Sequence, residues 1–249
     1  TYPNMGSPEE YGAHALACKQ QGYTHYKIHP YYFWDPVTQQ PDRGRPSHIE
    51  QDIEACEAVR DAVGPDMTLS YDPWGTYRTY EDAVRVGRAL ERLDFYWYEH
   101  PMSEYRVAAY EKLTRELDIP ILAPEIAAGS VYTRADWIRR EASDMSRIDV
   151  LRGGITGVRK LTGVCEAYGV RCEIHMSGFA NLQILGATSE DTSQYYERGL
   201  LAPGVDYETP PPYLNALCDP MDADGYVRVP TAPGMGYDIN WDYIEENRV

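Results

Sequence analysis

Acidic residues recur at regular intervals in the middle of the chain, each at the end of a short apolar run. Asp72 follows MTLSY, Glu99 follows FYWY and Glu125 follows ILAP, at separations of 27 and 26 residues. Carboxylates brought together repel one another, and their pKa values rise unless a cation neutralises them. Oxygen ligands that leave room for water or substrate suit Mg²⁺ better than Zn²⁺, which prefers histidine and cysteine. The spacing therefore predicts that these three acids form a Mg²⁺ site.

Basic side chains accompany these acids at other predicted strand ends. In the run YKIHP, Lys27 and His29 point the same way, because successive side chains of a strand alternate. The ammonium of Lys27 disfavours the charged form of His29 and keeps that ring a usable base near neutral pH. Asp149, His175 and Glu197 also end predicted strands, and a carboxylate such as Asp149 would fix the tautomer of His175. A metal flanked by bases suits removal of a proton alpha to a carboxylate, since the metal stabilises the enediolate that forms.

Helical and strand-like stretches alternate along most of the chain, and they must position these residues. Helical patterns are predicted at residues 8–22, 48–64, 80–93, 107–117, 133–142, 154–169 and 179–190. Strand-like runs are predicted at residues 2–5, 23–29, 67–72, 95–99, 120–125, 146–151, 170–175 and 194–199. The alternation predicts a TIM-type (β/α)7β barrel over residues 1–202, rather than a doubly wound sheet. The chemistry of such barrels is built at the C-terminal ends of the strands, where the candidate residues fall.

The composition limits the classes of partner. A formal net charge of −16 argues against nucleic acid and against an anionic membrane. No apolar run approaches the length of a membrane span. The five cysteines are scattered and show no CxxC spacing, so neither a disulfide framework nor a zinc site is indicated. We therefore expect a cytoplasmic protein whose small carboxylate substrate is held by a cation.

Two segments depart from the regular alternation. Residues 30–48 lengthen one β/α unit, and insertions at the C-terminal rim of a barrel usually serve binding. Arg43 and Arg45 in this segment are candidates to contact a polyhydroxylated acid. Residues 203–249 are rich in proline, glycine and tyrosine, and we expect them to form a tail that packs on the barrel.

The histidines outside the predicted site divide into two groups. His14, His25 and His48 fall on helices or early in a strand, which favours a structural interpretation. His100 follows Glu99 directly, and residues next to a ligand often orient the metal site without binding the ion.

Several runs of the sequence resemble a known family. LSYDP, WYEHP, LAPEIAAG, DVLRGGITG, EIHMSGF, YYERGL and DGYVRVPTAPGMGYDI occur in the order and phase of the barrel domain of the mandelate racemase / muconate lactonizing enzyme subgroup of the enolase superfamily. The resemblance covers nearly the whole chain. It implies that Asp72, Glu99 and Glu125 bind Mg²⁺.

The same resemblance implies catalytic roles. His175 and Asp149 would form a dyad on one face of the substrate, and Lys27 or His29 would supply the base on the other face. Glu197 matches the acid of the last strand, which hydrogen-bonds the developing enediolate in that subgroup. Members of the family begin with an α+β capping domain, which this chain lacks, so we expect an upstream segment or another chain to provide it. We also expect a homo-oligomer.

The leading hypothesis is a Mg²⁺-dependent dehydratase of a sugar acid. One base would abstract the proton alpha to the carboxylate, and an acid would expel the β-hydroxyl group. A racemase or epimerase of a 2-hydroxy acid or sugar acid shares the first step and is the alternative. An inactive barrel fragment without its cap is the third possibility.

Overall fold

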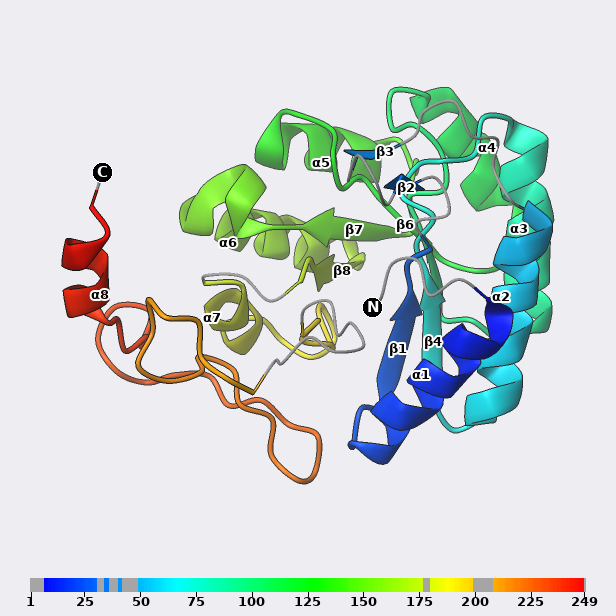
Figure 1. Ribbon diagram of the computed structural model, residues 1–249. Helices are drawn as coiled ribbons and strands as arrows, with labels where there is room; N and C mark the ends of the chain where they lie inside the picture. Colours follow the sequence, from blue (N-terminus) through cyan, green and yellow to red (C-terminus); the bar gives the residue numbers. More distant parts are fainter. Residues whose placement is uncertain are drawn as a thin grey trace.

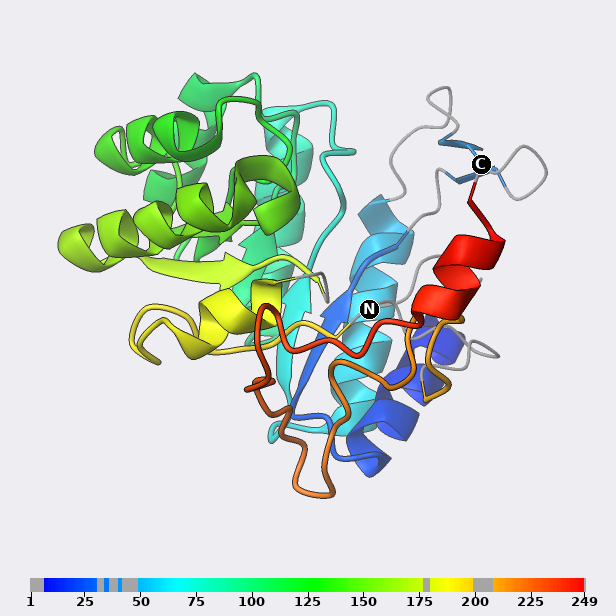
Figure 2. The same cartoon turned by 90° about the vertical axis from the view of Figure 1, so that its left-hand side faces the viewer.

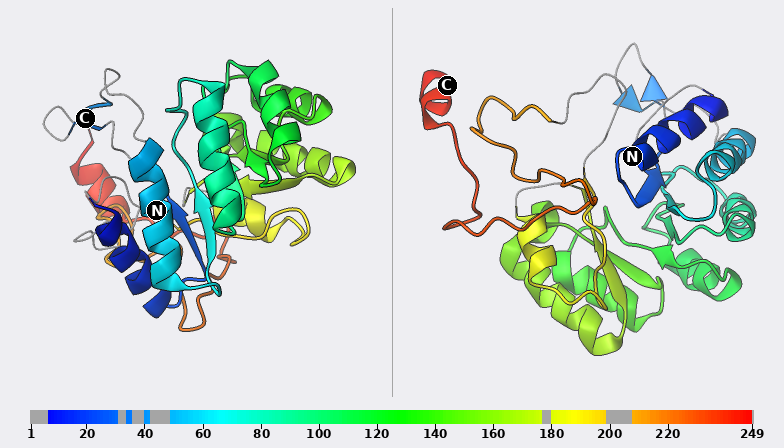
Figure 3. Two further views of the ribbon diagram at one scale, coloured as in Figure 1. Left: turned by 90° about the vertical axis from the view of Figure 1, so that its right-hand side faces the viewer. Right: turned by 90° about the horizontal axis from the view of Figure 1, so that it is seen from below.

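The central element of the computed structural model is a parallel six-stranded sheet (Figure 1). The structure describes residues 7–30, 34–35, 40–41, 49–176, 180–198 and 208–248. In order across the sheet, the strands are β1 (His25–Ile28), β4 (Thr68–Tyr71), β5 (Trp97–Glu99), β6 (Ile121–Leu122), β7 (Met145–Ile148) and β8 (Arg171–Ile174). This order is also their order along the chain, as expected for consecutive β/α units. The sheet curls into a half-barrel, and the right-hand view of Figure 3 shows helices along its outer side.

Each of the seven predicted helices is present. They are α1 (Pro8–Gln20), α2 (Ile49–Val63), α3 (Tyr80–Arg92), α4 (Val107–Glu116), α5 (Ser130–Arg139), α6 (Val150–Tyr168) and α7 (Asn181–Gly186). Local signals explain several of their ends. Ser7 forms a capping box with Glu10 at the start of α1, Thr79 caps α3, and Gly169 ends α6 in a left-handed conformation. Gly12 lets α1 approach α2 closely, because a Cβ atom there would lie 2.9 Å from the carbonyl oxygen of Ala58.

Closure of the barrel remains a prediction. The expected strand at residues 2–5 lies outside the described residues. Beside β8, Cys172 N donates to Thr192 O at 2.8 Å, and Ile174 forms a parallel bridge with Tyr196. Between these contacts Tyr195 N turns to the carboxylate of Glu173 at 3.4 Å. This side-chain bond interrupts the ladder, so the predicted strand at 194–199 is reduced to an isolated bridge within the described part of the chain.

An apolar layer separates the sheet from the helices. Leu69 and Tyr71 of β4 belong to a buried cluster that also contains Val59 of α2. Burial of a side chain of this size contributes about 1.5–3 kcal/mol. Because side chains of a strand alternate, Ser70 and Asp72 face the opposite, inner side. The inner side carries the polar groups and ends at the candidate site.

Two histidines occupy packed positions, as the sequence interpretation expects. His14 Nδ1 lies 2.8 Å from the hydroxyl of Tyr26. His25 Nε2 lies 2.7 Å from Ser70 Oγ, and burial lowers the pKa of His25 to about 3. Outside the described residues lie Arg43, Arg45 and His48.

The segments outside the alternating units have their own short elements. In the insertion, β2 (Trp34–Asp35) pairs antiparallel with β3 (Gln40–Pro41). The C-terminal segment runs past α7 and ends in α8 (Trp241–Glu246), the red helix in Figure 1 and Figure 2. Gln183 of α7 donates to the carbonyl oxygens of Pro230 and Met235, at 2.8 and 3.1 Å. Among the described helices, none has the length and apolar character that crossing a membrane would demand.

Candidate functional site

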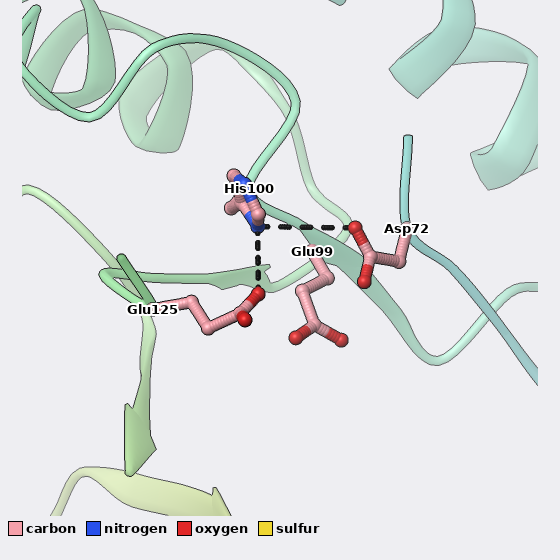
Figure 4. Close-up of side chains that lie close together, drawn as sticks. All are labelled: Asp72, Glu99, His100 and Glu125. Carbon is pink, nitrogen blue, oxygen red and sulfur yellow. Dashed lines mark ion pairs between the residues drawn. The ribbon is translucent and has the colours of Figure 1, made fainter. Parts of the chain in front are cut away.

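Four side chains from the ends of three neighbouring strands form a compact polar cluster. Asp72 follows β4, Glu99 ends β5, His100 comes next, and Glu125 lies after β6. Each offers one ligand atom, and these atoms lie within 4.8 Å of one another. Figure 4 shows Asp72 and Glu125 on either side of the His100 ring, with Glu99 between them. All four residues are buried, so the cluster is a preformed set of donors that could hold a metal ion.

The electrostatics of this cluster favour a bound positive charge. His100 Nδ1 lies 3.0 Å from Glu125 Oε2 and 3.8 Å from Asp72 Oδ1. Burial opposes the charged ring, but these carboxylates prevail and raise the pKa of His100 to about 9. Burial also raises the pKa values of Asp72 and Glu99. The three carboxylates fit a hard divalent cation, which would neutralise the acids in place of the protonated His100 ring.

Lys27 lies against three of the acids. Its Nζ is 2.8 Å from Glu99 Oε2, 2.7 Å from Glu197 Oε1 and 3.6 Å from Asp72 Oδ2. Burial and nearby Arg147 act to lower the pKa of Lys27, but the carboxylates outweigh them and raise it above its ordinary value. In this arrangement Lys27 is therefore a proton donor and a counter-ion.

His29 has the opposite protonation. Its Nε2 lies 3.4 Å from Asp72 Oδ2. Burial, together with the ammonium of Lys27, lowers the pKa of His29 to about 3. The ring is neutral near pH 7, in the direction expected from the Lys27 charge, so β1 presents one cationic and one neutral nitrogen to the cluster.

Arg147 is a central residue of the site that the sequence interpretation missed. On β7 its Nε lies 2.7 Å from Glu99 Oε1, and its Nη2 contacts Glu197 Oε2. Met176 N also donates to Glu197 Oε2, at 3.1 Å. Burial opposes ionisation of Glu197, but Arg147 and Lys27 hold the pKa of this acid well below its ordinary value. The signal was present, because strand alternation places Arg147 on the same face as the carboxylate two residues later.

His175 and Asp149 form a hydrogen-bonding pair at the ends of β8 and β7. His175 Nδ1 lies 3.2 Å from Asp149 Oδ2. Asp149 also caps α6, because its Oδ1 accepts a hydrogen bond from Leu151 N at 2.9 Å. Asn181 Nδ2 donates to Asp149 Oδ1 at 3.2 Å and to His175 O at 2.8 Å. Burial acts to raise the pKa of Asp149, but the hydrogen bonds from His175, Leu151 and Asn181 outweigh burial and lower it. Asn181, from α7, thus connects both members of the pair, and nothing in its sequence context predicted this role.

The two groups of bases reach the cluster from different strands. His29, after β1, contacts Asp72, whereas His175, after β8, places Nε2 3.4 Å from Glu125 Oε1. The eight residues singled out in the sequence are therefore joined by direct contacts and through His100. They are Lys27, His29, Asp72, Glu99, Glu125, Asp149, His175 and Glu197. This arrangement can polarise an acid and move protons on two sides of it.

Known proteins share this architecture. A solved structure of D-glucarate dehydratase from Agrobacterium tumefaciens, complexed with magnesium, is 41% identical, with a TM-score of 0.90 over 98% of this chain and 61% of that protein. Arabinonate dehydratase of Saccharolobus solfataricus is 28% identical over 80% of this chain and 52% of its own length. D-galactarolactone cycloisomerase of Agrobacterium fabrum is 29% identical over 81% of this chain and 54% of its own length. The chain thus spans about half the length of the curated relatives it matches.

A family model confirms the resemblance read from the sequence. The model described as "Enolase C-terminal domain-like" matches residues 10–243, which is most of the chain. A solved mandelate racemase/muconate lactonizing protein from Paracoccus denitrificans is 27% identical, with a TM-score of 0.81. The strand order and the buried acidic cluster agree with these matches. The chain belongs to the enolase C-terminal domain-like family, among the mandelate racemase and muconate lactonizing enzymes.

Proposed function

We propose that this chain carries the active site of a Mg²⁺-dependent dehydratase of sugar acids. The observation that carries the proposal is the cluster of buried acids with nitrogen bases on two sides. Asp72, Glu99 and Glu125 would hold the Mg²⁺, which supplies Lewis-acid stabilisation of the negative charge on the substrate carboxylate. His100, which contacts two of these acids, would orient them.

The proton steps are assigned to the flanking residues. One side removes the proton alpha to the carboxylate, and the electron pair left on carbon expels the β-hydroxyl group. The opposite side protonates that hydroxyl, so water leaves, and the enol then tautomerises to a 2-keto-3-deoxy acid by taking up a proton at carbon 3 and releasing its hydroxyl proton. His175, held by Asp149, serves one side, and Lys27 or His29 serves the other. Glu197 is ionised between Lys27 and Arg147, so its part in the proposal is to hold these two cations in place beside the substrate.

The relatives point to the substrate class. Two of the proteins described above act on sugar acids by dehydration according to their names, D-glucarate dehydratase and arabinonate dehydratase. Hydroxyl groups beta to the carboxylate are present throughout such compounds. D-glucarate is the first candidate to test, because the glucarate dehydratase shares the higher identity with this chain.

We also propose that a capping domain covers the site. Four exposed apolar side chains belong to the chain segments that follow β6 and β7, next to Glu125 and Asp149 in the sequence: Ile126 (44% exposed), Tyr132 (84%), Leu151 (77%) and Ile155 (50%). Exposed apolar groups that gather on one face typically mark an interaction surface. A cover there would exclude water and strengthen the electrostatic interactions of the site.

The test is a screen of aldonic and aldaric acids by mass spectrometry, with Mg²⁺ and with excess chelator. Long incubation at high protein concentration makes slow turnover detectable. We expect one or more acids to lose a single water, and chelation to stop the reaction. A product of unchanged mass but inverted configuration would instead establish the epimerase alternative, which the bases on two sides of the cluster also permit. Failure of every acid to react would favour the inactive fragment.

A further inference from the structure

The segment that carries Glu125 is held on both edges by buried charged side chains. After β6 the chain leaves the sheet, so the backbone groups of residues 125–129 have no strand to pair with. The Glu104 carboxylate, from the loop after β5, accepts hydrogen bonds from Glu125 N and from Ala127 N, the latter at 2.5 Å. One acid therefore satisfies two backbone donors of this segment.

A guanidinium satisfies the acceptors of the same two residues. Arg134 of α5 donates from Nη2 to Glu125 O at 2.6 Å and from Nη1 to Ala127 O at 2.9 Å. It also donates from Nε to Arg147 O on β7, at 3.3 Å. In both Glu125 and Ala127, the backbone N–H is thus bonded to the Glu104 carboxylate and the backbone C=O to the Arg134 guanidinium.

Burial makes this arrangement costly unless it is complete. Glu104 is 7% exposed and Arg134 is 3% exposed. Buried charges cost free energy unless they are paired or fully hydrogen-bonded, and so does a buried backbone group that is left unpaired. Glu104 bonds to the backbone nitrogen of Glu125, on one side of its Cα, and Arg134 bonds to the carbonyl oxygen, on the other side. Rotation of the backbone here would break bonds to both charges at once, so the direction of the Cα–Cβ bond of Glu125, from which its carboxylate extends, is fixed.

We propose that Glu104 and Arg134 are positioning residues that hold the Glu125 carboxylate in the orientation needed to bind the metal ion. This inference rests on the proposed metal site. Neither side chain is expected to bind the ion itself, since both are already bonded to the backbone. Residues that orient ligands in this way typically change metal affinity by about 10–100-fold when replaced.

The chain supplies a matched control at the other end of β6. There the Glu91 carboxylate of α3 accepts from Asp118 N at 2.6 Å and from Ile119 N at 3.3 Å, in the segment that precedes the strand. Glu91 therefore has the same chemistry as Glu104, an acid that bonds two backbone N–H groups, but it lies at the end of the strand away from the cluster. Its replacement should affect stability without affecting the metal site.

The experiment compares Glu104→Gln, Arg134→Lys and Glu91→Gln in the full chain. Mg²⁺ affinity is measured by calorimetric titration, stability by thermal unfolding, and exchange of the Glu125 and Ala127 amide hydrogens by NMR without metal. We expect Glu104→Gln and Arg134→Lys to weaken Mg²⁺ binding about 10–100-fold and to speed exchange of both amides. Glu91→Gln should leave Mg²⁺ affinity and the exchange of these two amides unchanged, even if its unfolding temperature falls as much as that of Glu104→Gln.

Two outcomes would overturn the inference. If Glu104→Gln and Glu91→Gln lowered stability equally and neither altered Mg²⁺ affinity, Glu104 would be structural only. If amide exchange at residues 125 and 127 stayed slow in both Glu104→Gln and Arg134→Lys, these two side chains would not be holding the backbone of this segment. Absence of Mg²⁺ binding in the unaltered chain would count against the proposed function instead, and the amide measurement separates that failure from this one.

Discussion

Lys27 and Arg147 supply the positive charge around which the acids of the site are arranged. Both cations contact Glu99 and Glu197, so each acid is shared between two buried partners. Removing one member of a buried ion pair costs about 3–5 kcal/mol, because it leaves an uncompensated charge. The rotamers of Glu99 and Glu197 are therefore fixed from two sides before any substrate arrives.

Replacing His175 or Lys27, the acid–base groups on the two sides of the cluster, should slow dehydration strongly. We expect His175→Asn and Lys27→Ala each to lower the rate of water loss by roughly 10² to 10⁴-fold, the usual contribution of one general acid or base. Mg²⁺ binding should persist in His175→Asn, because Glu125, at 3.4 Å, is the one proposed metal ligand for which a contact with this ring is described. The measurement is product formation by mass spectrometry, beside calorimetric titration with Mg²⁺.

The same variants separate the two sides of the site. In deuterated water, His175→Asn should still exchange the alpha proton of the substrate, since the β1 groups remain in place. Full dehydratase activity in either variant would contradict the roles assigned to them. Loss of Mg²⁺ binding in His175→Asn would show that this residue acts through the metal site.

Residues at strand ends could be predicted from the sequence, whereas residues that act through loops could not. Asp72, Glu99 and Glu125 recur with the period of a β/α unit, and parallel strands bring their ends to one edge. Glu104 and Arg134 have no such period. Their partners are backbone groups of a neighbouring loop, whose position depends on tertiary packing rather than on any residue pattern.

At the scale of elements, one buried acid connects α2 to the loop after β4. Tyr77 donates its hydroxyl to Asp52 Oδ2 at 2.5 Å, and the hydroxyls of Tyr77 and Tyr71 are 3.1 Å apart. Tyr77 N also donates to Pro101 O, at 3.1 Å. The contact therefore ties α2 to the two loops that hold Asp72 and His100. Burial raises the pKa of Asp52 to about 7, although the tyrosine hydroxyls oppose the shift.

This acid should make the fold less stable as the pH rises. The folded-state pKa of Asp52, about 7, exceeds the unfolded value near 4, so its stabilising effect is complete below about pH 4 and is lost as the pH rises to about 7. At about 1.4 kcal/mol per pKa unit, wild type should lose roughly 3 kcal/mol relative to Asp52→Asn between pH 5 and pH 8. Urea unfolding at both pH values measures this difference.

An exposed acid on the same helix provides the control. Asp61 of α2 is exposed, so Asp61→Asn should follow the pH dependence of the wild type. Equal slopes for wild type and Asp52→Asn would show that Asp52 does not titrate in this range.

The helices were predictable because their ends carry local signals, but the edges of the sheet were not. Ser7 and Thr79 cap their helices from one turn away, a relation that is visible in the sequence. The run at 194–199 has strand composition, yet Tyr195 N bonds to the Glu173 side chain instead of to backbone. The short helix α8 was not predicted. Its six residues include no buried side chain, so no apolar face signals it.

For the whole molecule, the four exposed apolar residues proposed to meet a capping domain lead to a prediction about the rate of turnover. Ile126, Tyr132, Leu151 and Ile155, in the segments that follow β6 and β7, are exposed. If a cap normally covers them, this chain alone should bind Mg²⁺ but turn over sugar acids well below the roughly 1–10³ s⁻¹ typical of enzymes. Steady-state kinetics on the best substrate of the screen measure this rate. Turnover within the typical range would show that no cover is needed.

Because the strands lie in the sheet in their order along the chain, neighbouring strands of the site are also made one after another during synthesis. Lys27 leaves the ribosome before Asp72, Glu99 and Glu125, whereas Arg147 follows Glu99 by 48 residues, which at typical rates of elongation is roughly 2 to 10 s. A growing chain that pairs its strands in order would therefore bring Asp72 and Glu99 to the Lys27 ammonium before Arg147 is made. Lys27 would then be the first counter-ion of these two acids, and Arg147 would reach Glu99 later, with Glu197 last.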